Sequence, residues 1–350
     1  MTHKENFLRM VNFERPDYIP MNYSINGACF HHYDQSQLFD LMEAHKILFP
    51  GFKRPEIPYT PAYSLVQLKD HPYTDDFGCV WETSDDGITG VVTGHPLEDW
   101  TAFDSWKAPD PNVCCGIGPL NWDQIAKNIR KGKERGDLIG GGLRHGHTFL
   151  QLCDLRGYEN LLMDMMDEEE KLPQLIQAVS DFNFEIIKRY VDLGVDIVYF
   201  GEDLGMQVGP MLSPTLFRQY IKPCYKRMMQ YARDRGVMIH MHSDGDIRTL
   251  VDDLVDGGVQ IINLQDLVNG IDWIAKNLAG KYAIELDIDR QNVTVYGTPA
   301  DCDALIREEI EKLSTRQGGL AMVYGLYPGT PIENAAAIMD AMEKYMYYHD

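Results

Sequence analysis

Positive charge, long apolar runs and paired cysteines are all scarce in this chain of 350 residues. Lysine and arginine number 32 against 53 aspartates and glutamates, so the net charge of -21 argues against nucleic acid and anionic membranes as partners. No apolar run approaches the roughly 20 residues of a membrane span. The charged N-terminus MTHKENFLRM also lacks the apolar core of a signal peptide. We therefore expect a soluble, cytoplasmic protein.

The seven cysteines are scattered, which excludes a disulfide framework and a CxxC metal knuckle and fits a reducing compartment. The chain also has no GxGxxG motif opening a βα unit, no GxxxxGK[ST] loop, no GxSxG elbow and no HExxH motif. Their absence disfavours nicotinamide and ATP chemistry. Since no Pro/Gly/Ser-rich linker divides the chain, we predict one domain spanning residues 1–350.

Short β-branched and aromatic runs alternate with amphipathic helical segments along most of the chain. Strands are expected at 19–24, 138–143, 196–200, 237–242, 259–264, 281–286 and 319–324. Helices are expected at 2–11, 35–48, 122–135, 171–193, 214–235, 247–256, 271–278, 299–316 and 332–347. Seven strands alternating with helices favour an α/β fold of the (β/α)8 TIM-barrel type over an open sheet.

Four local features refine this pattern. Residues 74–100 carry strand residues around the turn SDDG, which predicts a β-hairpin inserted early in the barrel. Pro223 lies inside a helical segment and predicts a kink or break near Ile221. Asp167 with Glu170 resembles a capping box ahead of the helix at 171–193. The methionines at 163–166 and 228–229 are interpreted as helix packing.

Acids and histidines follow the strands at 196–200 and 237–242, and chemistry collects at such strand ends in βα architectures. His240 and His242 share one face of their strand, and with Asp244 they form a candidate metal-ligand set, although paired strand histidines more often serve packing. Glu202 and Asp203 point to opposite faces of an extended chain. Either is a candidate ligand or general acid, and the other caps the following turn.

Further polar residues end other strands. The strand LIGGGL is followed by Arg144, His145 and His147, of which Arg144 and His147 could hold an anion or an oxygen, while a salt bridge is an equal alternative for Arg144. Asn22 lies near the end of the first strand and Tyr324 at the end of the last.

Several longer segments resemble the uroporphyrinogen decarboxylase superfamily. They are LRGYENLLMDM (155–165), FGEDLGMQ (200–207), LSPTLF (212–217), HSDG (242–245), GVQIIN (258–263) and TPIEN (330–334). The resemblance runs from the first strand to the end of the chain. It implies a (β/α)8 barrel with its pocket at the carboxyl ends of the strands. The superfamily contains porphyrinogen decarboxylases and corrinoid-dependent methyltransferases.

Two departures from the family pattern bear on the reaction. The decarboxylases carry an arginine-rich segment after the first strand, which grips a substrate with many carboxylates, whereas NYSINGACFHHY at 22–33 has no arginine. The thiol-methylating branch has cysteines where this chain has Asp244 and Tyr324. A nitrogen and oxygen site suits activation of an oxygen atom rather than a thiolate.

The branch that remains resembles anaerobic enzymes that move a methyl group from a methoxylated aromatic compound to the cobalt of a corrinoid (cobalamin) protein, which is an O-demethylation. This resemblance implies a corrinoid protein as partner and zinc as a hypothetical metal. The residues assigned are His242, Glu202 and Asp203 for catalysis, His240, His242, Asp244 and Glu202 for the metal, and Arg144, His147, Tyr324 and Asn22 for the substrate.

Three alternatives stay open from the sequence. They are a decarboxylase or lyase acting on an acid other than uroporphyrinogen, a methylcobamide:thiol methyltransferase, and a non-catalytic member that binds a corrinoid or a tetrapyrrole. Whether the chain forms a homodimer is also open.

Overall fold

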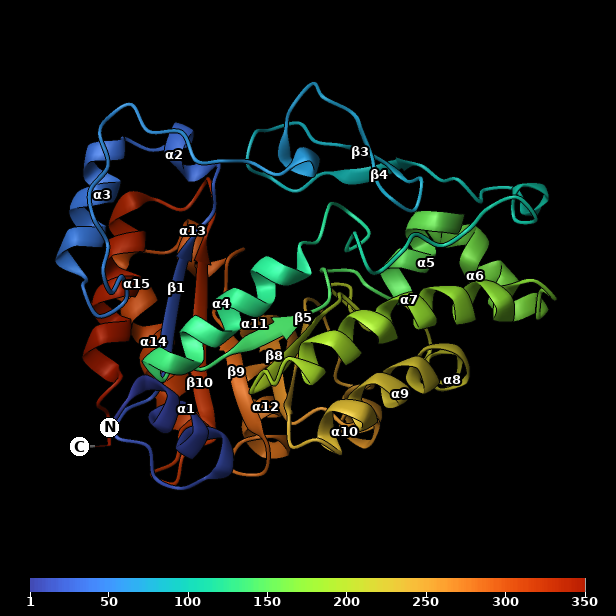
Figure 1. Cartoon of the computed structure of the whole chain (residues 1–350). Helices are drawn as coiled ribbons and strands as arrows, with labels where there is room; N and C mark the ends of the chain where they lie inside the picture. Colours follow the sequence, from blue (N-terminus) through green and yellow to red (C-terminus); the bar gives the residue numbers. More distant parts are fainter. Residues whose placement is uncertain (350) are drawn as a thin grey trace. The chain divides into compact units, whose positions relative to one another are not determined.

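The computed structural model describes residues 1–349, which form two compact units. Unit 1 contains residues 1–71, 83–89 and the segment from 264 onward, and unit 2 contains residues 72–82 and 90–263. Seven strands, β1 and β5 to β10, alternate with helices along the chain in the (β/α)8 pattern (Figure 1), which confirms the predicted fold class. The prediction of a single domain stays a prediction. Among residues 1–349 no helix is long and apolar enough to cross a membrane.

Unit 1 is built on parallel strands at the two ends of the sequence. Strand β10 (Leu320–Leu326) pairs in parallel with β1 (Met21–Ile25) and with β9 (Ala283–Asp287). The helices of this unit are α1 (His3–Asn12), α2 (Cys29–His32), α3 (Gln35–Ala44), η1 (Leu65–Gln67), α11 (Asp266–Asn269), α12 (Ile271–Asn277), α13 (Val293–Tyr296), α14 (Pro299–Leu313) and α15 (Ile332–Tyr345). Strand β8 (Ile261–Gln265) is buried along its whole length and runs across the boundary between the units.

Capping explains where two helices of unit 1 begin. The hydroxyl of Thr2 accepts from the Glu5 amide, and the Glu5 carboxylate accepts from the Thr2 amide, which satisfies donors that α1 itself leaves unpaired. Thr298 and Asp301 make the same reciprocal pair at the start of α14, where Pro299 occupies the first helical position.

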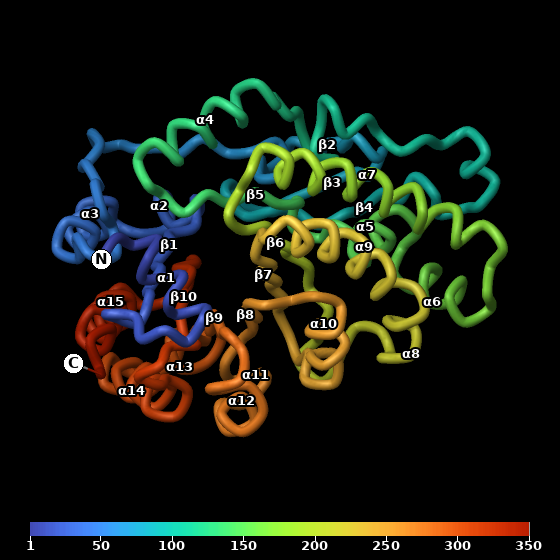
Figure 2. Tube along the Cα trace, turned by 60° about the horizontal axis from the view of Figure 1, so that its bottom comes forward, coloured from blue at the N-terminus to red at the C-terminus, as the bar shows by residue number. Residues whose placement is uncertain are grey.

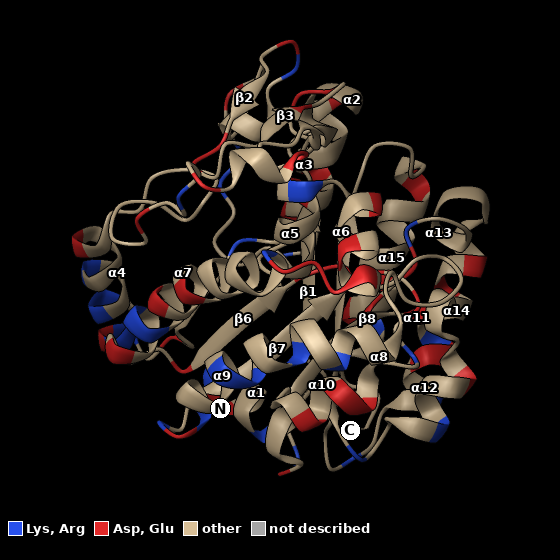
Figure 3. Cartoon of the chain, turned by 90° about the vertical axis from the view of Figure 1, so that its right-hand side faces the viewer, with Lys and Arg blue, Asp and Glu red and all other residues tan. Residues whose placement is uncertain are grey.

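Unit 2 contains three parallel strands, β5 (Gly140–Gly142), β6 (Ile197–Gly201) and β7 (Met238–Ser243), with β6 between the other two. Its helices are η2 (Trp100–Ala102), α4 (Trp122–Arg135), α5 (Phe149–Arg156), α6 (Tyr158–Asp167), α7 (Leu172–Asp192), α8 (Pro214–Leu216), α9 (Lys222–Arg233) and α10 (Val251–Gly257). Helices α7 and α9 contact each other and cover the strands, as Figure 2 shows. Basic residues gather on α4 and α9 (Figure 3), where Lys222 pairs with Asp253.

The insertion predicted at residues 74–100 is present as an antiparallel sheet. It consists of β2 (Tyr73–Thr74), β3 (Val80–Glu82) and β4 (Val91–Gly94), with β3 in the middle. The turn between β3 and β4, residues 83–89, packs within unit 1, although the strands on either side belong to unit 2.

The break predicted from Pro223 is confirmed. Residues Phe217–Ile221 form a π-helical turn, and α9 starts directly after it at Lys222. Proline lacks the amide hydrogen that a regular helix needs at this position, so the helix widens before it.

One local prediction was wrong and another was wrong in part. Asp167 is the last residue of α6, and α7 begins at Leu172 without a side-chain cap, so Asp167 and Glu170 form no capping box. Helix packing of the methionines is confirmed for Met165, Met228 and Met229, which are buried, but Met163 and Met166 are 61% and 73% exposed and do not pack in a core. They lie three residues apart, so they share the solvent face of α6, whereas Met165 faces inward.

Candidate functional site

The histidine–aspartate cluster of His145, Asp203 and His242 lies at the carboxyl ends of β5, β6 and β7 in unit 2. Asp203 Oδ1 is 3.2 Å from His145 Nε2 and 3.6 Å from His242 Nε2. One ligand atom from each residue falls within 4.8 Å of the others. The three strands are parallel and Gly201 lies opposite His242 in the register, so the segments after these strands meet at one edge.

The loop after β5 turns back toward the cluster at Gly146. Its φ angle of +69° lies in the left-handed region, which glycine adopts without strain. The amide of Gly146 donates to the carbonyl oxygen of Gly201 at 2.8 Å, so the loop is joined to the end of β6. This turn brings His145 beside Asp203 and directs His147 into the interior.

The environment of Asp203 favours its charged form. Burial acts to raise the pKa of this carboxyl, but hydrogen bonds from His145 and His242 outweigh it and hold the pKa well below its usual range. The amide of Asp244 donates to the same oxygen at 3.0 Å. Asp203 is therefore a carboxylate that faces two imidazole nitrogens.

His242 is oriented by a second contact on the other side of its ring. Its Nδ1 lies 2.6 Å from the side-chain oxygen of Asn263 and donates to it in this pairing, so Nε2 is the nitrogen that faces the cluster. Asp244 Oδ1 is 3.6 Å from the same Nε2 and adds a second carboxylate at the edge of the cluster.

Two of the four residues predicted to bind a metal, His242 and Asp244, lie close enough to share an ion. The other two, His240 and Glu202, belong to none of the metal-compatible groups found among residues 1–349. His240 is buried two positions earlier in β7, and its ring packs edge-on against Tyr199 at 5.1 Å. Two strand residues span roughly 6.6 Å, so equal side-chain direction does not bring both histidines to one ion.

Glu202 is fully buried in a separate hydrogen-bond network. Its Oε1 accepts from the amides of Thr148 at 2.7 Å and Leu150 at 2.9 Å, and its Oε2 accepts from the Tyr225 hydroxyl. Burial raises the pKa of Glu202 to about 7, against the opposing effect of these hydrogen bonds. The Glu202 carboxyl group thus accepts hydrogen bonds from amides at the start of α5 that the helix itself leaves unpaired.

Arg144 and His147 are also committed to internal contacts. The Arg144 guanidinium pairs with Asp154 at 3.2 Å, donates to Gln151 at 3.1 Å and stacks over Trp81. The salt-bridge alternative is therefore the one the structure shows. His147 is 1% exposed, its Nδ1 lies 2.6 Å from the Thr148 hydroxyl, and burial lowers its pKa well below the usual value.

The two remaining predicted substrate residues belong to unit 1. Asn22 is exposed on β1. Tyr324 is fully buried on β10, and its hydroxyl lies 3.3 Å from that of Thr330. Burial raises the pKa of Tyr324, so this phenol is neutral at pH 7.

Sequence reasoning gave His145 no role, although it is a full member of the cluster. The signal was the strand end RHGH, in which a glycine separates two histidines. In a regular strand His145 and His147 would lie on the same face, because they are two residues apart. A left-handed glycine between them breaks this pattern, so only one of the two can face the neighbouring strand ends.

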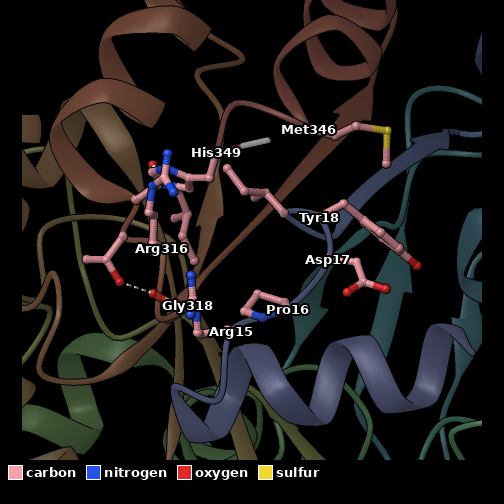
Figure 4. A pocket seen from close by; sticks show the side chains of 12 residues that line it. Arg15, Pro16, Asp17, Tyr18, Arg316, Gly318, Met346 and His349 are labelled. Atoms are coloured by element: carbon pink, nitrogen blue, oxygen red, sulfur yellow. Dashed lines mark hydrogen bonds between the residues drawn. The ribbon is translucent and has the colours of Figure 1, made fainter. Parts of the chain in front are cut away.

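Unit 1 has a cavity of about 220 Å³ at the amino ends of β1 and β10 (Figure 4). Arg15, Arg316 and His349 are among its lining residues. In β/α barrels this end of the strands serves stability, whereas ligands and catalytic groups collect at the carboxyl ends. The histidine–aspartate cluster is therefore the stronger candidate for chemistry.

Convergent acids and histidines at the carboxyl ends of parallel strands define a (β/α)8 protein with a metal-compatible polar site. Comparison with known proteins specifies the family. The profile described as uroporphyrinogen decarboxylase (URO-D) matches residues 87–345, and the chain belongs to this family. The resemblance noted in the sequence is thereby confirmed.

Individual relatives are distant. The uroporphyrinogen decarboxylase of Thermus thermophilus is 24% identical over 185 residues, and that of Parasynechococcus marenigrum is 25% identical over 169 residues. These matches cover 51% and 47% of this chain, and the chain spans about half the length of these curated relatives, 50% and 46%. A solved methyltransferase from Methanosarcina mazei has a TM-score of 0.62 at 17% identity, with 98% of each chain covered. That likeness concerns the fold.

Proposed function

We propose that the protein is a methyltransferase that moves a methyl group from a methoxylated aromatic compound to the cobalt of a corrinoid carried by a partner protein. Membership of the URO-D family and the full-length fold similarity to a methyltransferase support this class. The observation that carries the proposal is the donor set of His145, Asp203 and His242, with Asp244 beside it. It contains nitrogen and oxygen atoms and no sulfur.

The donor set fits a divalent metal such as zinc. Two imidazole nitrogens and one carboxylate oxygen leave coordination positions for a substrate oxygen and water, as in catalytic zinc sites. The 3.2 Å and 3.6 Å separations between donor atoms resemble the roughly 3.3 Å spacing around one tetrahedral ion. His145, Asp203 and His242 replace the ligand set proposed from the sequence. A cation held there would supply a Lewis acid for the ether oxygen.

The demethylation needs charge stabilisation at one atom. The bond between the methyl carbon and the ether oxygen breaks, its electron pair stays on the phenolic oxygen, and the new carbon–cobalt bond takes its pair from reduced cobalt of the partner. An unactivated phenolate is a poor leaving group at neutral pH, so stabilisation of the developing negative oxygen is the main task of the protein.

The chain's own residues serve this task by orientation. Asn263 fixes which nitrogen of His242 faces the cluster, and Asp203 lies 3.2 Å from the His145 nitrogen and 3.6 Å from the His242 nitrogen. A set of donors positioned before the substrate binds loses little free energy to reorganisation during the reaction.

A decarboxylase that acts on a small acid is the second candidate, because the curated relatives are uroporphyrinogen decarboxylases. The arginine-free segment at 22–33 weighs against a substrate with many carboxylates. The two candidates differ in their requirements, since decarboxylation would proceed without a corrinoid protein.

The test incubates the purified chain with a panel of methoxylated aromatics and a reduced corrinoid protein. We expect the absorption spectrum of methyl-cobalt to appear and the phenol to be released. Both signals should be lost in His242→Ala. They should be retained in His71→Ala, the control that removes an exposed histidine. Elemental analysis should find about one zinc fewer in His242→Ala. Carbon dioxide release without corrinoid would favour the decarboxylase, and the absence of methyl-cobalt with every donor would refute the proposal.

A further inference from the structure

A second group of metal-compatible side chains lies in unit 1 and shares no residue with the histidine–aspartate cluster. His31 and His32 are neighbours in α2, and both direct Nε2 at the carboxylate of Asp85 in the turn between β3 and β4. His31 Nε2 is 3.1 Å from Oδ1, and His32 Nε2 is 2.5 Å from Oδ2. One ligand atom from each of the three residues lies within 4.8 Å of the others. These residues fall in two segments that stand out in the sequence, the arginine-free stretch 22–33 and the SDDG turn.

Both ring nitrogens of His31 have a polar neighbour. Nδ1 lies 3.3 Å from the Tyr63 hydroxyl, whose own hydrogen can go to the Gly27 carbonyl at 3.4 Å. In the tautomer that donates from Nδ1 to Tyr63, His31 presents a lone pair on Nε2.

This tautomer creates a requirement at the other side of the ring. A lone pair on Nε2 would face the carboxylate of Asp85 at 3.1 Å, and two acceptors at that distance repel unless a cation lies between them. The cation is either a proton, which makes an imidazolium, or a metal ion. A histidine that uses Nδ1 for a fixed hydrogen bond and Nε2 for its ligand is the usual arrangement at protein metal sites.

The turn that carries Asp85 is already held against α2 without a metal. Gly87 has a φ angle of +88°, and a Cβ atom there would lie 2.4 Å from the Ala28 backbone nitrogen, so the two backbones touch. The Gly87 amide also donates to the Gln67 carbonyl oxygen at 2.9 Å. The three ligand-forming residues are thus positioned by the fold, which lowers the cost of binding an ion.

We propose that His31, His32 and Asp85 bind a divalent transition-metal ion of the zinc class, separately from the histidine–aspartate cluster. Two imidazoles and one carboxylate match the ligands that zinc accepts, and their partial exposure leaves a position for water. In one tetrahedral ion the donor atoms lie roughly 3.3 Å apart, so the 2.5 Å pair must separate by about 1 Å. The ion would fasten the turn at residues 83–89 to α2.

The experiment titrates zinc chloride into chelator-treated protein and measures stoichiometry and affinity by calorimetry. His242→Ala provides the background, because it disables the histidine–aspartate cluster and leaves this site alone. We expect one zinc per chain in that background. The bound zinc should be lost when His31→Ala or Asp85→Asn is added, and kept when His71→Ala is added as the matched exposed histidine.

Two further variants leave all three ligands in place. Tyr63→Phe should weaken zinc binding by on the order of 10-fold, because it removes the hydrogen-bond partner that orients the His31 ring at Nδ1. Gly87→Ala should weaken it by displacing the turn. No zinc in the His242→Ala background, or zinc that is unaffected by His31→Ala, would overturn the proposal. Methyl transfer is scored in a separate assay, so failure of the proposed function does not decide this result.

Discussion

Glu202 and Asp203 are neighbours in the sequence, but their replacement by alanine should have opposite effects on stability and on metal binding. The carboxylate of Glu202 is fully buried, and that of Asp203 faces the histidine–aspartate cluster. Glu202→Ala should destabilise the fold strongly, whereas Asp203→Ala should destabilise it less and remove the zinc of the histidine–aspartate cluster. The comparison tests which of the two acids is the structural one.

The magnitude for Glu202→Ala follows from its contacts. The substitution leaves the amides of Thr148 and Leu150 and the hydroxyl of Tyr225 without their acceptor in the interior. Each buried group that loses its partner costs about 1–3 kcal/mol, and water entering the new cavity recovers part of this. We expect a total loss of about 3–5 kcal/mol in the free energy of unfolding.

Glu202→Gln is the matched control. The glutamine oxygen can replace Oε1 as the acceptor for both amides, and its NH₂ group can donate to the Tyr225 oxygen. We expect a loss of only about 1 kcal/mol for this variant. Asp203→Ala removes hydrogen bonds to a carboxylate, but solvent reaches this half-buried position, so it should cost about 1–2 kcal/mol.

The assay is urea unfolding followed by far-ultraviolet circular dichroism, together with elemental analysis of each variant for zinc. The expected order of stability is wild type, Asp203→Ala and Glu202→Gln close together, and Glu202→Ala far below. If Glu202→Ala unfolds at the wild-type urea concentration but loses its zinc, the structural role assigned to Glu202 is refuted.

Three further substitutions test the interior. Burial raises the pKa of Asp154 from 3.8 to about 6, so the stability contributed by its protonated form is fully present below pH 3.8 and is lost as pH rises through 6. Between these pH values the free energy of unfolding of the wild type should fall by about 3 kcal/mol relative to that of Asp154→Asn. Parallel pH profiles of the two proteins would contradict the raised pKa. Burial and the nearby Asp266 hold the pKa of Glu309 well above its usual value, which favours the uncharged form that glutamine resembles. Glu309→Gln should therefore change the free energy of unfolding at pH 7 by less than about 1 kcal/mol. A larger loss in urea unfolding would mean that a carboxylate is needed. Gly142→Ala would place a Cβ atom 2.3 Å from a main-chain oxygen of β6, so β5 must shift. The free energy of unfolding should fall by about 2 kcal/mol or more, measured by thermal unfolding. An unchanged melting temperature would contradict this expectation.

Periodicity was sufficient to predict most of the regular structure. Helix α4 was predicted with its observed bounds, and the break before Pro223 was placed correctly, because both depend on side-chain patterns and backbone chemistry within a few residues. The capping box at Asp167 failed because α6 continues to that residue. Local sequence alone could not exclude this longer helix.

The sequence by itself determined the alternation of strands and helices, the family and the strand ends at which polar residues gather. It could not determine how each chain segment turns after its strand. Tertiary structure decided that Asp203 rather than Glu202 faces His242, that His145 joins them, and that Arg144 is held in an internal ion pair. The reason is physical, since the direction of a side chain after a strand depends on loop dihedral angles and on contacts with residues distant in sequence, which no local pattern encodes.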